Sequence, residues 1–115
     1  MQNAFSEITG DINPLHIDKS FANQKNFDRC VCFGMLTASF LSTLAGVYLP
    51  GQNSLIHGVE VKMLKPVFVD DSITVKGEVV EKNDLFKLLI IKISIINQDG
   101  VKVMKGKMNV GVLDE

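Results

Sequence analysis

The chain has 115 residues, of which 46% are hydrophobic and 22% charged, and its net charge is −1. Its length predicts one domain over residues 1–115, and its composition is that of a folded globular protein, not of a disordered or fibrous one. A nearly neutral chain with scattered basic residues is not expected to bind nucleic acid or an anionic membrane.

The sequence also lacks the signals of export. No apolar run approaches the roughly 20 residues that cross a bilayer, and the polar start Met1-Gln2-Asn3 does not resemble a signal peptide. We therefore expect a cytoplasmic protein with no membrane partner. Cys30 and Cys32 are expected to be packing residues, since one Cys-x-Cys pair forms neither a disulfide framework nor a metal site.

The first third of the chain reads as helix and loop. Residues 4–9 look like the end of a helix that stops at Gly10, a residue suited to the left-handed cap position. Residues 11–18 are predicted to form a loop instead of a helix, because Pro14 restricts Asn13 to extended conformations.

Two further helices are predicted after this loop. Asp18 is suited to cap a short helix that runs through Asn26. Residues 34–49 are apolar on nearly every face and are followed by Pro50-Gly51, which predicts a long buried helix.

The second half of the chain reads as strand. Apolar and polar residues alternate, or β-branched residues cluster, in residues 59–63, 72–80, 86–96 and 101–112. The last two strands are expected to form a hairpin across Gln98-Asp99-Gly100. One long buried helix followed by an antiparallel meander predicts an α+β domain of the hot-dog type, in which a curved sheet wraps around a central helix.

An acid and an imidazole stand close together in the segment between the first two helices. Asp11 and His16 are five residues apart, and the Asn13-Pro14 turn between them limits the conformations of the loop. Such a pair can take a proton from water and supply one to carbon at neutral pH. In the alternative interpretation Asp11 binds only backbone amides and His16 is solvated.

A second feature lies at the start of the long helix. Phe33-Gly34-Met35 opens this helix, and a helix N-terminus presents free N–H groups and the positive end of the dipole. Glycine lets a ligand approach the backbone closely. The Gly34 N–H is therefore a candidate oxyanion donor for a thioester carbonyl.

Both features resemble one known family. Gly10-Asp11-x-Asn13-Pro14-x-His16 and the helix start Gly34-Met35-Leu36-x-Ala38-Ser39 resemble the MaoC-like (R)-specific enoyl-CoA hydratases, and the likeness covers nearly the whole chain. The resemblance implies that Asp11 and His16 activate a water molecule, that the Gly34 N–H polarises the thioester carbonyl, and that Ser42 supports the pair. Water would add to a trans-2-enoyl thioester to give the (R)-3-hydroxyacyl product.

The same resemblance implies the partners. The substrate would be a thioester of coenzyme A or of acyl carrier protein, no metal or redox cofactor would be needed, and the protein would form a homodimer or a larger homo-oligomer. Two departures from the family are visible. Phe33 stands where many members carry histidine, and members begin with about one strand and most of a helix more, so this chain is expected to lack an N-terminal strand and part of a helix.

The sequence also bears on two other functions and on a second histidine. A hot-dog thioesterase would need an acid or base on the central helix, and residues 34–49 contain no Asp, Glu or His. A catalytically idle acyl-binding module would be expected to have lost Asp11 or His16. His57-Gly58 has the same residues as the family's histidine–glycine pair, but it falls in a strand region. His57 is therefore expected to have a structural role or to lie on the surface.

Overall fold

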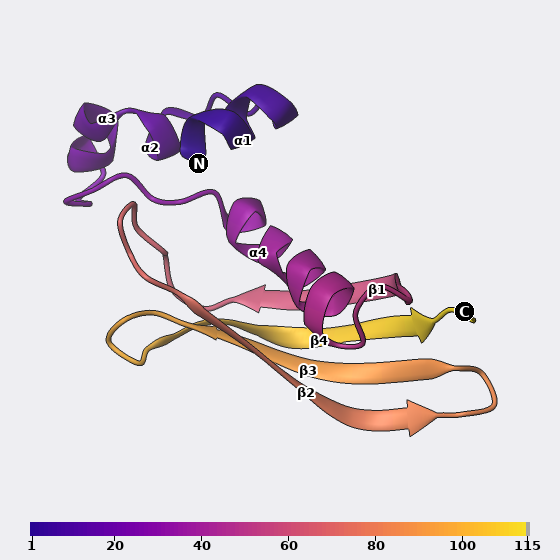
Figure 1. The fold of residues 1–115 in the computed structure, drawn as a ribbon. Coiled ribbons are helices and arrows are strands. Elements are labelled where there is room, and N and C mark those ends of the chain that lie inside the picture. The colour runs from indigo at the N-terminus through magenta and orange to yellow at the C-terminus, as the bar shows by residue number, and fades with distance from the viewer. Residues whose placement is uncertain (115) are drawn as a thin grey trace.

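The computed structural model describes residues 1–114. Short helices come first, then one longer helix, then a sheet (Figure 1). The elements are α1 (Gln2–Thr9), α2 (Pro14–Ile17), α3 (Lys19–Gln24), α4 (Gly34–Thr43), η1 (Leu44–Tyr48), β1 (Ser54–Met63), β2 (Thr74–Asn83), β3 (Leu88–Ile96) and β4 (Lys102–Val112).

The segment between α1 and α3 contains a helical turn that the sequence did not predict. Residues 14–17 form a single helical turn, α2, so the prediction of a loop over residues 11–18 was wrong there. Asn13 is extended, as expected before proline, and Pro14 occupies the first helical turn, where its missing N–H costs nothing. Gly10 ends α1 in the left-handed conformation, and Asp18 caps α3, both as predicted.

The long helix is regular only in its first part. It is α-helical from Gly34 to Thr43 and continues to Tyr48 as a π-helical turn, η1, whereas the sequence predicted one helix through Leu49. Leu41 and Ala45 are buried against the sheet, which explains the apolar character of the segment.

The sheet has four antiparallel strands in the order β1-β4-β3-β2. β3 and β4 form the predicted hairpin. β1 begins at Ser54, five residues before the predicted start at residue 59. A bulge at His57 interrupts the alternation of this strand, since Ile56 pairs with Val110 and Gly58 pairs with the adjacent Asn109. The turn between β2 and β3 comes later than predicted, since β2 extends to Asn83.

The core lies between α4 and the inner face of the sheet. On β3 the inward residues alternate with outward ones, as the two-residue period requires. The fully buried side chains of the two central strands include Ile91, Ile93, Ile95, Met108 and Val110. This packing fixes α4, and therefore Gly34, relative to the sheet.

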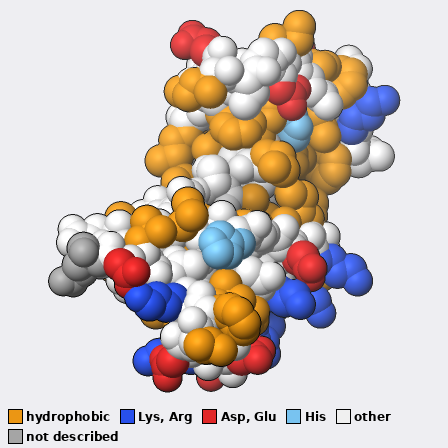
Figure 2. All heavy atoms as spheres, turned by 90° about the vertical axis from the view of Figure 1, so that its right-hand side faces the viewer, with side chains coloured by type: hydrophobic (Ala, Val, Ile, Leu, Met, Phe, Trp, Pro, Cys, Tyr) orange, Lys and Arg blue, Asp and Glu red, His pale blue; other side chains and the backbone are white. Residues whose placement is uncertain are grey.

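The molecule is long and thin. Its principal extents are 53 × 30 × 18 Å, and the N-terminal helices lie beyond the first turn of α4, away from the sheet (Figure 1). Hydrophobic side chains prevail over the upper part of the face in Figure 2, where these helices lie, and Lys, Arg, Asp and Glu side chains surround the lower part. Between Met1 and Asp114 no helix is both long and apolar enough to cross a membrane.

Candidate functional site

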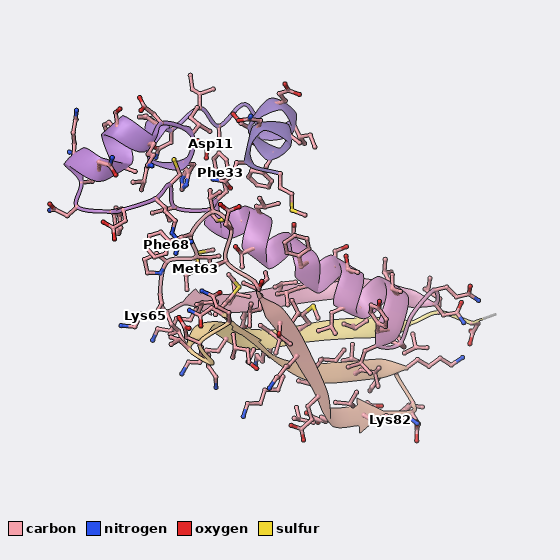
Figure 3. All side chains as sticks on the ribbon, turned by 60° about the vertical axis from the view of Figure 1, so that its left-hand side comes forward. Asp11, Phe33, Met63, Lys65, Phe68 and Lys82 are labelled. Atoms are coloured by element: carbon pink, nitrogen blue, oxygen red, sulfur yellow. The ribbon has the colours of Figure 1, made fainter. Side chains whose placement is uncertain are left out.

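The site is built where the N-terminal helices meet the start of α4. Figure 3 shows Asp11 and Phe33 together beyond the N-terminal end of α4, with Met63 and Phe68 between them and the sheet. Gly34 is the first residue of α4, so its N–H has no acceptor within the helix. An external oxygen can bind there.

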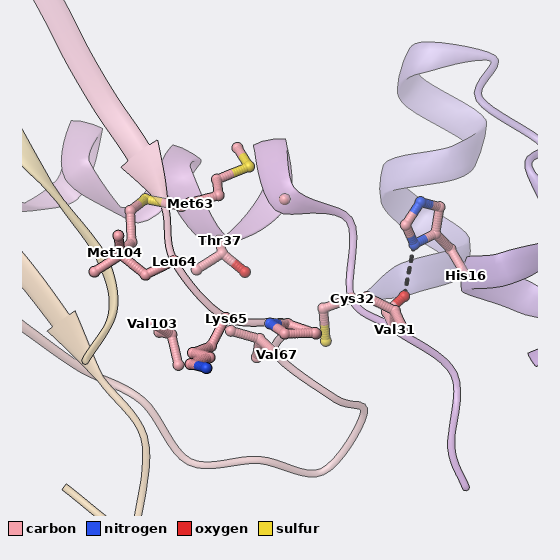
Figure 4. A pocket seen from close by; sticks show the side chains of 12 residues that line it. His16, Val31, Cys32, Thr37, Met63, Leu64, Lys65, Val67, Val103 and Met104 are labelled. Atoms are coloured by element: carbon pink, nitrogen blue, oxygen red, sulfur yellow. Dashed lines mark hydrogen bonds between the residues drawn. The ribbon is translucent and has the colours of Figure 1, made fainter. Parts of the chain in front are cut away.

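His16 is held in one orientation by the backbone of a neighbouring segment. Its Nδ1 lies 2.6 Å from the carbonyl oxygen of Val31 (Figure 4). A carbonyl only accepts, so Nδ1 carries the proton and the neutral ring keeps its free lone pair on Nε2. The half-buried ring also packs on Phe33, with ring centroids 4.2 Å apart.

Phe33 therefore has a structural part in the site. It is 2% exposed and lies between Phe5 and His16, with its ring centroid 4.9 Å from that of Phe5. The departure from the family's histidine places an apolar wall beside the imidazole. The candidate donor at Gly34 is a backbone N–H, so it does not depend on the side chain at position 33.

Asp11 lies at the rim of the same site. It is exposed, and its Oδ1 accepts a hydrogen bond from the Asn13 N–H at 3.0 Å. Asn13 in turn accepts from the Leu15 N–H at 3.1 Å and caps α2, so it fixes the turn as predicted. Asp11 thus does bind a backbone amide, but His16 is not simply solvated as the alternative interpretation required.

Two cavities meet at His16 and Gly34. One, of about 390 Å³, brings Asp11 and His16 together with Phe5, Thr9, Phe33, Gly34 and Met35. The other, of about 280 Å³, extends from His16 and Gly34 toward the end of the sheet (Figure 4). The structure thus brings together three of the predicted residues, Asp11, His16 and Gly34.

The second cavity is lined mainly by residues that the sequence did not single out. Met63, Leu64, Val103 and Met104 supply apolar walls, and the buried Thr37 supplies a hydroxyl one turn after Gly34. Thr37 had a detectable signal, since it is one helical turn from the glycine. The lining residues from β1 and β4 gave no signal in the sequence, because their position depends on strand pairing.

Ser42 is not brought to this site. It is exposed, lies about 12 Å along the helix from Gly34, and lines neither of the two cavities that contain His16. Within one chain Ser42 therefore does not lie beside the pair, and its supporting role stays a prediction. His57 is exposed in β1, as expected.

A carboxylate network holds the segment that follows β1. Asp71 accepts from the Phe68 N–H at 2.9 Å, from Gln98 at 3.0 Å and from Arg29 at 3.2 Å. Burial alone would raise the pKa of Asp71, but these donors and the Arg29 charge bring its pKa below the ordinary value. The pKa of Cys32 is raised, first by burial and then by the charge of Asp71.

No cluster of three or more His, Cys, Asp or Glu side chains with metal-binding geometry occurs among residues 1–114.

A protein-family model identifies the family of the chain. The model of the MaoC like domain matches residues 1–98. The chain belongs to this family.

The relatives of this MaoC-like chain carry related names. An (R)-specific enoyl-CoA hydratase from Aeromonas caviae is 36% identical over 90% of this chain and 78% of its own length. A 3-hydroxybutyryl-CoA dehydratase from Methylorubrum extorquens is also 36% identical, over 67% of this chain, and the chain spans only 49% of that protein.

A solved structure agrees. The (R)-hydratase from A. caviae superimposes with a TM-score of 0.92 at 34% identity, over 96% of this chain and 83% of that chain. The predicted α+β hot-dog fold is thereby confirmed. A hypothetical thioesterase from Streptococcus pneumoniae shares the fold at 22% identity, with a TM-score of 0.62.

Proposed function

We propose that this MaoC-like chain is a hydro-lyase that adds water to a trans-2-enoyl thioester, or removes it from an (R)-3-hydroxyacyl thioester. The observation that carries the proposal is that Asp11, His16 and Gly34 line one cavity, and that His16 and Gly34 also line a second one. The names of its relatives point to the same reaction.

His16 is the base in this proposal. With Nδ1–H bound to Val31, its Nε2 is free to accept a proton from a water molecule. The water oxygen bonds to C3 of the enoyl chain, and C2 receives a proton through the Asp11–His16 pair, so the addition consumes no net proton. Because the groups are held in the folded chain, orientation contributes to the rate.

Gly34 stabilises the charge that develops on the thioester oxygen. Its N–H points out of the start of α4, where the helix dipole adds positive potential. No carboxylate lies on α4 or η1, and the region Gly34–Tyr48 contains no histidine. This absence disfavours hydrolysis, because a hot-dog thioesterase would need an acid or base on the central helix.

The substrate carrier is coenzyme A or acyl carrier protein, and the active form is a homodimer. Relatives named for each carrier support the first statement. The second is supported by the open edges of a four-stranded sheet and by the isolated N-terminal helices.

The test is hydration of crotonyl-CoA. The reaction is monitored by the loss of enoyl absorbance, and the product is identified by chiral analysis. We expect the (R)-3-hydroxy product from the wild type and losses of about 10²-fold or more for Asp11→Asn and His16→Ala. His57→Ala is the matched control, since His57 is the other histidine of the chain and lies outside the site. It should retain wild-type activity.

Two results would contradict the proposal. One is a folded wild type that leaves both crotonyl-CoA and an eight-carbon enoyl-CoA unchanged. The other is release of free thiol from coenzyme A at a rate above that of hydration, which would identify a thioesterase.

A further inference from the structure

The side chain of Gln2 connects the three segments that build the proposed site. Its Nε2 lies 2.8 Å from the carbonyl oxygen of His16 and 3.1 Å from that of Val31. Its Oε1 accepts a hydrogen bond from the Phe33 N–H at 3.2 Å. One amide on α1 therefore contacts the segment of the base, the acceptor of the base, and the residue before Gly34.

The chemistry of these partners fixes how the amide is turned. Two carbonyl oxygens require donors, and one N–H requires an acceptor, so only one orientation of the amide satisfies all three. The exchanged orientation would place its oxygen against two carbonyl oxygens. Only a primary amide supplies this combination of two donors and an acceptor from one planar group.

Val31 is the important member of this set. Its carbonyl oxygen accepts from both His16 Nδ1, at 2.6 Å, and Gln2 Nε2, at 3.1 Å. If this carbonyl turned away, the proton of the neutral ring would have no reason to stay on Nδ1, and Nε2 would cease to be reliably unprotonated. Gln2 therefore acts on the base through its acceptor.

The contact with Phe33 extends the same effect to the oxyanion donor. Phe33 precedes Gly34 and packs on the His16 ring. Holding the Phe33 N–H thus limits the movement of Gly34 relative to the imidazole. These contacts are partly buried, so they compete with water less than exposed hydrogen bonds do.

We propose that Gln2 is a positioning residue, which keeps His16 in the Nδ1–H tautomer and keeps the Gly34 N–H in register with it. Gln2 itself touches no reacting atom. The catalytic consequence rests on the proposed function, whereas the effect on the tautomer does not.

The first experiment needs no substrate. The ¹⁵N chemical shifts of the His16 imidazole are measured at about pH 8.5, where an imidazole is ordinarily neutral. The wild type should show a protonated Nδ1 and an unprotonated Nε2. Gln2→Met, which keeps the length of the side chain and removes its hydrogen bonds, should give a mixture of both tautomers.

The second experiment is kinetic. Gln2→Met should lower kcat by about tenfold and change KM by less than about twofold, because orientation of the base matters mainly in the transition state. Gln2→Glu is the second variant: it keeps the acceptor for Phe33, removes both donors, and suits the first turn of a helix, so it should fold. It should show the same two changes.

Asn3→Ala is the matched control, since Asn3 is exposed on the same helix. It should change neither the tautomer nor kcat. Wild-type ¹⁵N shifts and kcat in both Gln2 variants would overturn the proposal. A tautomer change in a protein whose wild type hydrates no enoyl thioester would refute the proposed function and leave the action of Gln2 on the ring in place.

Discussion

A side chain at position 34 would collide with the opposite wall of the cavity. A Cβ there would lie 2.6 Å from Sδ and 2.9 Å from Cε of Met63. These atoms are the end of a flexible side chain, so Gly34→Ala should fold after Met63 moves. The added methyl group would still obstruct a carbonyl that approaches the Gly34 N–H, and we expect kcat for hydration to fall by about 100-fold.

The double variant Gly34→Ala/Met63→Ala separates the two effects. It removes the collision but keeps the methyl group beside the N–H. Its kcat should stay as low as that of Gly34→Ala, while Met63→Ala alone stays active. Recovery of wild-type activity in the double variant would show that Gly34 only makes room for Met63.

Asp71 gives stability that depends on pH. Its pKa is below the ordinary 3.8 in the folded chain, so the folded state binds fewer protons than the unfolded state between these two values. Its contribution is complete above about pH 3.8 and is lost as the pH falls through the lower folded pKa. Asp71→Asn should therefore lower the free energy of unfolding at pH 7, by about 1–3 kcal/mol.

The difference between wild type and Asp71→Asn should shrink as the pH falls below 3.8. Urea unfolding from pH 7 down to pH 2.5 measures it. Asp70→Asn is the control, because Asp70 is the exposed neighbour and asparagine tolerates its positive φ of 74°. A difference that stays constant over this pH range would rule out the charge of Asp71 as the cause.

Single residues of the site were predictable where the local sequence carries their chemistry. The Asp11–His16 spacing, the Asn13 cap and the Gly34 helix start follow from neighbouring residues. Gln2 was not predictable, because its partners are up to 31 residues away. The supporting role of Ser42 comes from the family resemblance alone, and nothing in its own helix reveals which neighbours reach that turn.

At the scale of elements, α1 depends on how its last turn ends. Gly10 has a φ of 75°, and a Cβ there would meet nothing within 4 Å. Gly10→Ala should therefore cost only backbone strain, about 1 kcal/mol in the free energy of unfolding, and Gly10→Asn less. Denaturant unfolding checks this order, and equal stability of all three proteins would contradict it.

The elements were predicted best where periodicity is local. The hairpin β3–β4 and the buried α4 followed from their patterns. The α2 turn was missed because proline restricts the residue before it to extended conformations, although proline itself suits the first turn of a helix. The early start of β1 was missed because the bulge at His57 shifts the alternation, and a bulge is defined by its partner strand.

At the scale of the whole molecule, the chain is too extended for a compact monomer. Its radius of gyration is 16.1 Å, whereas a compact domain of this length has about 13 Å. The exposed apolar side chains include Ile8 and Ile12 on the N-terminal segment, at 84% and 75%. A surface of this kind usually marks a contact with another chain.

We therefore expect a homodimer in which the partner covers α1. Light scattering should give twice the chain mass of 12.7 kDa, and the melting temperature should rise with protein concentration because dissociation accompanies unfolding.

Ile8→Glu places a charge on α1 and should shift the equilibrium toward monomer. It should also reduce the hydration activity, since the helix that carries Gln2 would lose its cover. Glu7→Gln, at the exposed neighbouring position, should do neither. If Ile8→Glu stays dimeric with unchanged activity, α1 faces solvent, and the extended shape has to be explained by contacts at the sheet edges alone.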